Sequence, residues 1–165
     1  MFNLTDQEII QGFLETLRLK IIESQARKGI KASGKSADAL RVEVDKTGTN
    51  GKIIDGSGTF YYQEYGRGPY KGGERGGLWQ KIYDWLEYKK YGFNWANNKE
   101  REGMAFALTK KIQEYGTYTH FEGEPTGVLS EVITSEAIAP LVEQLKGKYL
   151  AKATSEVIKE LKEWQ

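Results

Sequence analysis

The sequence predicts an α+β fold in which helices accompany a small antiparallel hairpin. A capping-box pair, Thr5 and Glu8, precedes apolar residues at helical spacing. Residues 39–46 alternate apolar and polar side chains, as a half-buried strand does. A long helical pattern then fills the chain from about residue 138. With 165 residues, we expect a single domain over 1–165, with a Gly/aromatic-rich elaboration at about 66–98.

The N-terminal helix is expected over residues 5–28. Gly29 provides a stop at the position after the C-cap. The apolar face of this helix comprises Ile9, Ile10, Phe13, Leu14, Leu17 and Ile21.

The hairpin follows. Leu40, Val42 and Val44 share one face of the first strand, and the polar cluster 47–51 carries the Asn-Gly pair of a tight turn. Residues 52–55 form a short return strand. The next segment, FYYQEYG, fits either a third strand or a short helical turn, and its pattern does not separate the two.

The middle of the chain alternates glycine-rich loops with helices. Residues 66–77 hold six glycines and a proline, which predicts a loop. Helical spacing predicts helices over residues 78–91 and 99–115, separated by a polar-aromatic loop at 93–98. Gly116 ends the second of these helices.

The C-terminal part is expected to contain a loop over residues 117–127 and a short helix over 128–134. A long helix follows. Pro140 lies inside its pattern, so this helix is expected either to begin near Ala139 or to bend there. Its apolar stripe comprises Ile138, Leu141, Val142, Leu145, Tyr149, Ala153, Val157 and Leu161.

The composition argues against several classes of function. The chain has no cysteine, which excludes disulfides, thiol nucleophiles and Cys-rich zinc sites. The formal net charge is +1, so no overall field attracts nucleic acid or anionic lipid. The polar, acidic N-terminus does not have the pattern of a signal peptide, and no apolar run is long enough to span a membrane. We therefore expect a non-enzymatic protein without cofactor, metal or membrane partner, which resides in a cytosol or in something assembled there.

One sequence motif favours an enzyme instead. Residues 29–36 read GIKASGKS and fit the phosphate-binding pattern G-x-x-x-x-G-K-[ST]. A phosphate loop needs a strand before it and a helix of useful length after Lys35-Ser36. Here a helix is expected before Gly29 and a strand from Leu40, so a linker is the favoured interpretation. A nucleotide-binding enzyme that uses Gly29 to Ser36 stays as an alternative.

The single histidine gives little support for catalysis. His120 lies in the run THFEGE with Glu122 and Glu124. One histidine and two carboxylates fall short of the mixed ligand set of a metal site, and no nucleophile-elbow pattern is present. We interpret all three as exposed loop residues.

Aromatic residues are concentrated in the middle of the chain. Twelve of the 20 lie between Phe60 and Trp95, and residues 51–110 carry a net charge of +3. Tyr, Trp and Arg are enriched at protein interfaces. Packing against a small sheet and stacking on single-stranded bases are the alternatives. The candidate interface residues are Tyr61, Tyr62, Tyr65, Arg67, Tyr70, Trp79, Trp85 and Trp95.

The order of these segments resembles the neck and tail-completion proteins of tailed bacteriophages, over nearly the whole chain. The best match is the tyrosine-rich element followed by Glu-x-Gly-Arg-Gly-Pro at 61–69, and the next best is the amphipathic helix at 85–92. Residues 34–36 of this chain align with a short "small-Gly-x-Leu" segment that precedes the first strand in this family. The resemblance therefore explains the Gly-Lys-Ser sequence without a bound phosphate. The supporting segments are SGKSADALRVEV, YYQEYGRGP, LWQKIYDWLEYKKYG, KKIQEYGTYTH and TGVLSEVI.

The resemblance implies a structural virion protein with no catalytic residues, located in the neck or tail of the virion and assembled in the host cytoplasm. Such a head-tail connector subunit assembles with its own copies into a ring. The ring contacts a portal or adaptor protein and tail proteins. Portal-associated rings are commonly twelve-fold, and DNA passes through their lumen without specific binding. The basic middle of this chain is one hypothesis for the surface that faces the DNA. This chain departs from compact family members in its long aromatic segment at 70–98, which we expect to contact a neighbour.

Overall fold

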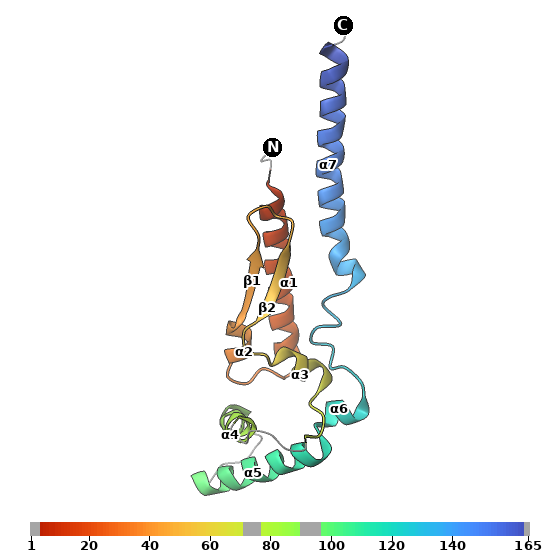
Figure 1. Ribbon diagram of the computed structural model, residues 1–165. Helices are drawn as coiled ribbons and strands as arrows, with labels where there is room; N and C mark the ends of the chain where they lie inside the picture. The colour runs from red at the N-terminus through yellow and green to blue at the C-terminus, as the bar shows by residue number, and fades with distance from the viewer. Residues whose placement is uncertain (1–3, 71–76, 90–96, 164–165) are drawn as a thin grey trace.

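The computed structural model describes residues 4–70, 77–89 and 97–163. The α+β class is confirmed: an N-terminal helix, a two-stranded antiparallel hairpin, middle helices and a long C-terminal helix follow one another along the chain. Figure 1 shows an elongated arrangement, with the hairpin beside the first helix, two middle helices at one end and the last helix extending past the other end.

Helix α1 spans Asp6–Arg27. The predicted capping box is present, because the Thr5 hydroxyl accepts from the N–H of Glu8 while the Glu8 carboxylate accepts from the N–H of Thr5. Strands β1 (Leu40–Val44) and β2 (Gly51–Asp55) pair antiparallel, with Val42 opposite Ile53. The turn is held by Asp45, and its hydrogen bond from the Asn50 side chain lowers the pKa of Asp45 to about 2.

The hairpin covers one side of α1, and their contact forms the first hydrophobic core. A Cβ on Gly51 would lie 2.6 Å from Leu14 Cδ1, so the strand lies directly against the helix. The buried members of this core are Leu17, Ile21, Leu40, Phe60, Val128 and Val132. The core therefore joins the N-terminal half of the chain to the segment before the last helix.

The segment FYYQEYG, for which the sequence allowed either a third strand or a short helical turn, forms a helix, α3, over Phe60–Tyr65. Asp55 at the end of β2 directs this choice, because its carboxylate accepts hydrogen bonds from the N–H groups of Ser57 and Phe60 at 2.9 and 2.8 Å. Those bonds turn the chain out of the hairpin and start a helix instead of a third strand.

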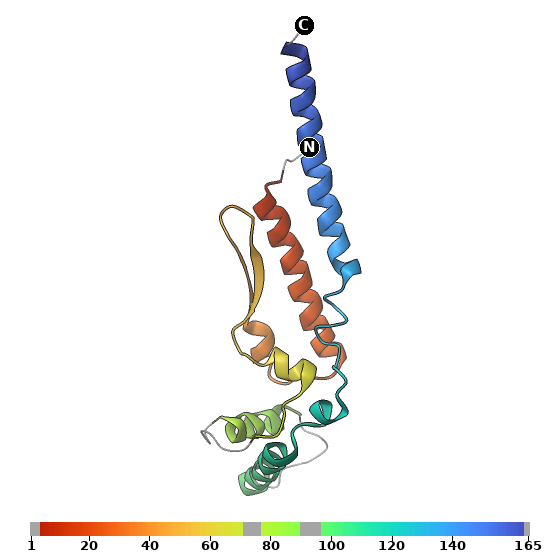
Figure 2. The same cartoon turned by 45° about the vertical axis from the view of Figure 1, so that its right-hand side comes forward.

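Helices α4 (Leu78–Lys89) and α5 (Asn98–Tyr115) pack against each other and form a second, separate core. Its buried residues are Ile82, Leu86 and Ala105. Figure 2 shows this helix pair below α3, away from the hairpin. The predicted loop at 93–98 falls largely outside the described residues.

Two expectations for the following segment are wrong. Within the predicted loop 117–127, residues Tyr118–Glu122 form a short helix, α6. Five residues are too few to show a helical period in the sequence. The predicted helix over 128–134 is instead a series of turns. There the N–H groups of Leu129 and Ser130 bond to the Glu64 carboxylate of α3 and not to carbonyls within a helix.

Helix α7 spans Ser135–Glu163, so of the two alternatives, a beginning near Ala139 and a bend there, the first is wrong. Thr134 explains the earlier start, because its hydroxyl accepts from the N–H of Ala137 at 3.2 Å. Pro140 is the sixth residue of this helix, so its ring removes the N–H that would otherwise donate to the Glu136 carbonyl. Among the described residues, no helix is both long and apolar enough to cross a membrane.

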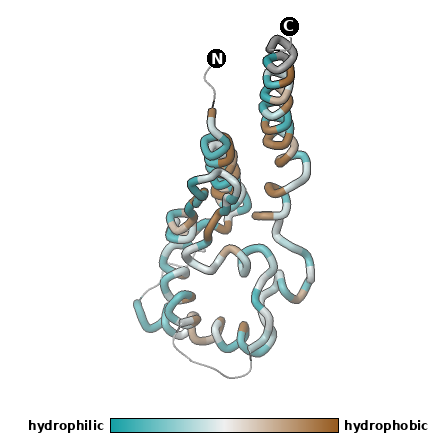
Figure 3. Tube along the Cα trace, turned by 45° about the horizontal axis from the view of Figure 1, so that its top comes forward, coloured by the Kyte–Doolittle hydropathy of each residue, from teal (hydrophilic) through white to brown (hydrophobic). Residues whose placement is uncertain are grey.

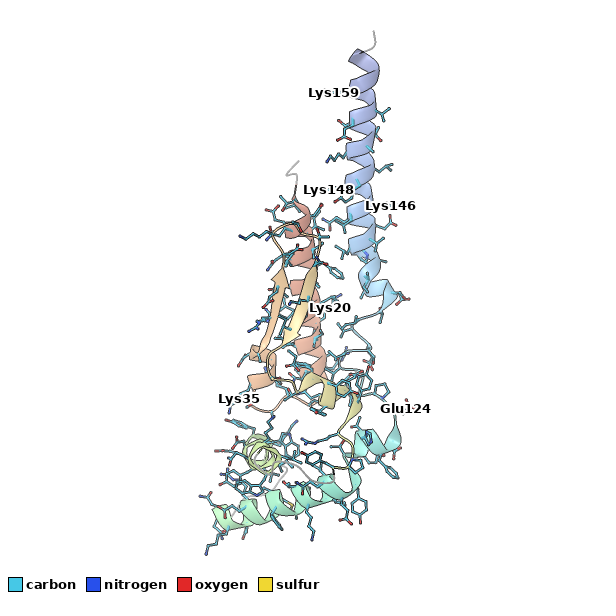
Figure 4. The ribbon with its side chains drawn as sticks, viewed as in Figure 1. Lys20, Lys35, Glu124, Lys146, Lys148 and Lys159 are labelled. Atoms are coloured by element: carbon cyan, nitrogen blue, oxygen red, sulfur yellow. The ribbon has the colours of Figure 1, made fainter. Side chains whose placement is uncertain are left out.

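Contact between α7 and α1 is polar at the N-terminal end of α1. The Lys148 ammonium bonds to the Asp6 carboxylate and to the Leu4 carbonyl at 2.6 and 2.7 Å, and the Tyr149 hydroxyl bonds to Asp6 (Figure 4). Figures 1 and 2 both show α7 continuing beyond this point. The residues after Lys148 extend it by about 22 Å at 1.5 Å a residue.

Candidate protein interaction surface

The GIKASGKS motif lies in a setting that differs from a phosphate loop. Gly29 follows helix α1, and only a four-residue helix, α2 (Lys35–Asp38), begins after Gly34. The described strands form one antiparallel hairpin, so no parallel strand delivers the loop to a phosphate. Instead, Lys35 and Ser36 line an open cleft of about 390 Å³ that faces Trp85 and Tyr88 of α4. This geometry matches the linker interpretation.

Five of the predicted interface residues are brought together around α3. We call Tyr61, Tyr62, Tyr65, Arg67 and Tyr70 the aromatic patch. Tyr61 contacts Tyr62 and Tyr65, with ring centroids 5.8 and 5.1 Å apart. The four tyrosines are between 40% and 63% exposed, which is unusual for so large a group of aromatic side chains.

Arg67 contacts two tyrosines of the aromatic patch, one in α3 and one after it. Its guanidinium carbon lies 5.6 Å from the centre of the Tyr62 ring and 5.4 Å from that of Tyr70. Both separations are within the range of cation–π attraction. Such contacts order the tyrosines before any partner arrives, which lowers the entropy cost of binding.

The three predicted tryptophans are placed differently. Trp79 and Trp85 pack against the second core, where Trp79 stacks on Tyr83 at 5.3 Å. Trp85 also lines the cleft beside α2. Trp95 lies outside the described residues. The aromatic patch therefore contains five of the eight predicted residues.

The Gly-Arg-Gly-Pro motif joins the two cores. The segment that precedes α4 lies beside the end of α5 and the residues that follow it. The N–H of Thr117 donates to the Arg67 carbonyl, and the N–H of Tyr70 donates to the Gln113 carbonyl, both at 2.8 Å. We call this pairing the clasp. Gly66 and Gly116 have φ values of 73° and 83° with ψ near 180°, a conformation open almost only to glycine. The clasp thus presents the aromatic patch at the junction of the two cores.

Glu64 fixes the other side of the aromatic patch, and sequence reasoning missed it. Its side chain is fully buried, and its carboxylate accepts from the N–H groups of Leu129 and Ser130 at 2.8 and 3.2 Å. Burial by itself opposes ionisation, but hydrogen bonds from Ser130, Leu129 and Thr126 together outweigh it and hold the pKa of Glu64 below its ordinary value. The one signal in the sequence is a single carboxylate inside the aromatic run FYYQEY.

The candidate catalytic or metal-binding groups are not assembled into a site. His120 and Glu122 are exposed on α6, and Glu124 is exposed just after it (Figure 4). The His120 ring lies against the Gly68 backbone of the clasp. In the part of the chain that the structure describes, no three His, Asp or Glu side chains are grouped to hold a metal ion.

A second exposed apolar surface lies on α7. Figure 3 shows hydrophobic positions continuing along α7 past the end of α1. Tyr149, Leu150 and Val157 are 54%, 66% and 57% exposed. A helix that projects alone into water is marginally stable unless its apolar face is packed against a partner.

The accessible surface of the chain is also large for its mass. It measures 12141 Å², whereas a compact monomer of 18.7 kDa exposes about 8,300 Å². The excess of about 3,800 Å² is larger than the ~800 Å² that one partner contributes to a standard interface. There is enough extra surface for contacts on more than one side of the subunit. Comparison of the chain with protein-family models, with curated proteins and with solved structures finds no match.

Proposed function

We propose that this chain is a structural virion protein of a tailed bacteriophage, a head-tail connector subunit that assembles with its own copies into a ring between portal and tail. The observation that carries the proposal is the excess of exposed surface, which is apolar and aromatic in two separate places. The order of sequence segments, which resembles neck and tail-completion proteins, supplies the biological setting.

The physical argument starts from the small size of the cores. Among the residues that the structure describes, the first core has six buried apolar residues and the second has three, while seventeen large apolar side chains are at least 38% exposed. A subunit that leaves so much apolar surface in water gains free energy when neighbours cover it. Closed cyclic assembly is the common way for identical subunits to cover such surface, and a ring is the form that a connector needs.

The aromatic patch is the first surface that we assign to contacts between copies. Replacing Tyr61, Tyr62 and Tyr65 together by serine is expected to weaken self-association by at least tenfold, because aromatic anchors carry a large share of interface energy. Mass photometry over a concentration series measures the effect. Phe106→Ser is the matched control, since Phe106 is 65% exposed but lies on α5 outside the patch. Equal association of the triple variant and the native protein would remove the patch from the interface.

Stacking of single-stranded bases is the competing function for the same residues. In the connector, DNA passes without specific binding, so added oligonucleotide should not quench tyrosine fluorescence by stacking. Titration of the native protein and of the triple tyrosine variant with a short oligonucleotide compares the two functions. Strong quenching in the native protein that the triple variant loses would favour the nucleic-acid function.

Nucleotide hydrolysis predicts a different result. If Gly29 to Ser36 bound a nucleotide, calorimetry would detect ATP or GTP binding, and Lys35→Ala would abolish it. The connector function predicts no binding heat in either protein.

A further inference from the structure

A groove runs between α1 and α7, and its walls are largely apolar. Ile9, Phe13 and Leu17 line it from α1, and Ala137 and Leu141 line it from α7. Its volume is about 370 Å³. This is a surface of the kind that receives the apolar face of an amphipathic helix.

Gly12 lies in the wall of this groove, in the middle of α1. A Cβ at this position would meet nothing within 4 Å, so the glycine leaves open space inside a single chain. Glycine inside a helix costs about 0.5–1 kcal/mol relative to alanine. The absence of a side chain here keeps the groove open, which is consistent with a second helix lying in it.

The same chain carries a helix with matching anchors. Leu150, Ala153 and Val157 follow one another at spacings of three and four residues on the projecting part of α7, and all three are exposed. Positions i, i+3 and i+7 form one face of a helix, which is the usual pattern of a helix held in an apolar groove. No residue in the described ranges 4–70, 77–89 and 97–163 buries this face.

Groove and anchors cannot meet within one chain. Residues 137–144 of α7 form a wall of the groove, and the anchors lie farther along the same continuous helix. The groove carries one charge of each sign, because Glu8 and Lys20 line it, and the anchors themselves are uncharged. Lys152 and Glu156 lie between the anchors in the sequence but line a pocket beside Asp6 of their own chain. Neither surface repels the other through net charge.

We propose that residues 150–157 of one copy lie in the α1–α7 groove of the next copy. The contact is heterologous, since it joins two different surfaces, and repeating it around a closing rotation gives a ring. The inference rests on the proposed function and deepens it by naming the surface through which copies join.

Cysteine cross-linking tests this contact directly, because the chain has no native cysteine. Gly12→Cys is mixed with Leu150→Cys, Ala153→Cys or Val157→Cys under mild oxidation. We expect at least one mixture to form a disulfide dimer in good yield, while each variant alone stays uncross-linked. Since each chain then carries one cysteine, every disulfide joins two copies. Gly12→Cys mixed with Lys110→Cys on α5 is the matched control and should not cross-link.

Two results would overturn the inference. Efficient cross-linking of Val157→Cys or Leu150→Cys with itself would show that the α7 helices pair with each other. An assembled protein, by mass photometry, without cross-links in any of the three mixtures would show that copies join elsewhere, and the proposed function would stand. A native protein that stays monomeric would instead count against the proposed function itself.

Discussion

Replacing Glu64 by alanine is expected to lower the free energy of unfolding by about 2–5 kcal/mol. The change leaves the N–H groups of Leu129 and Ser130 without the carboxylate that accepts their hydrogen bonds. A donor left buried without a partner costs about 1–3 kcal/mol, and these two donors are partly buried. Glu64 also links α3 to the turns that carry Val128 into the first core, so the loss spreads to packing. Urea unfolding at pH 7, followed by circular dichroism, measures the effect.

Glu131→Ala is the matched control, because Glu131 lies in the same turns but its side chain is 54% exposed and pairs with Lys28 at the surface. Exposed pairs of this kind contribute about 0–1 kcal/mol. Equal destabilisation by the two variants would contradict the role given to Glu64.

The pH dependence of this effect has a defined sign. The folded pKa of Glu64 is lower than the unfolded one, so its contribution is fully present above the ordinary glutamate pKa of about 4.3 and is lost as pH falls through the lowered value. The stability difference between the native protein and Glu64→Gln, which does not titrate, is therefore expected to be largest at neutral pH and to shrink below about pH 4. A difference that stays constant down to pH 3 would show that the carboxylate charge contributes nothing.

Replacing Gly66 or Gly116 by valine is the second large effect that we expect. Each glycine has a backbone conformation that costs other residues about 1–3 kcal/mol. A Cβ on Gly116 would lie 2.8 Å from the Arg67 carbonyl oxygen, and one on Gly66 would lie 2.5 Å from the Thr117 hydroxyl oxygen. Together, strain and steric clash are expected to destabilise each variant by at least about 3 kcal/mol and to open the clasp.

The clasp prediction has an internal control. Gly103 lies in α5, and a Cβ there meets nothing within 4 Å, so Gly103→Ala should stabilise the protein by about 0.5–1 kcal/mol. Thermal unfolding of the three variants gives their order of stability. Valine at Gly66 or Gly116 without loss of stability would mean that the two segments of the clasp do not lie in contact.

The sequence predicts local features well where the signal itself is local. The Thr5–Glu8 capping box and the alternation at residues 40–44 each depend on neighbours in the chain, and both are confirmed. The failures depend on contacts between distant residues. No spacing within 128–134 reveals that Glu64, more than 60 residues earlier, takes up the N–H groups that a helix would need.

The residues of the candidate interaction surface also differ in whether their placement depends on local sequence or on contacts between distant residues. Tyr61, Tyr62 and Tyr65 share one short helix, so their composition alone is enough to suggest a surface. Trp79 and Trp85 have the same composition signal, but packing with α5 half-buries them in a second core. The groove at Gly12 gives no sequence signal of its own, since it exists only once α7 lies beside α1.

The central claim is that this chain is built to be covered by copies of itself. Mass photometry of the native protein, from nanomolar to micromolar concentration, tests that claim most directly. We expect one discrete closed oligomer that forms cooperatively as concentration rises, with ring-shaped particles in electron micrographs of the same sample. A monomer of 18.7 kDa at every concentration, and also with purified portal and tail proteins added, would contradict it.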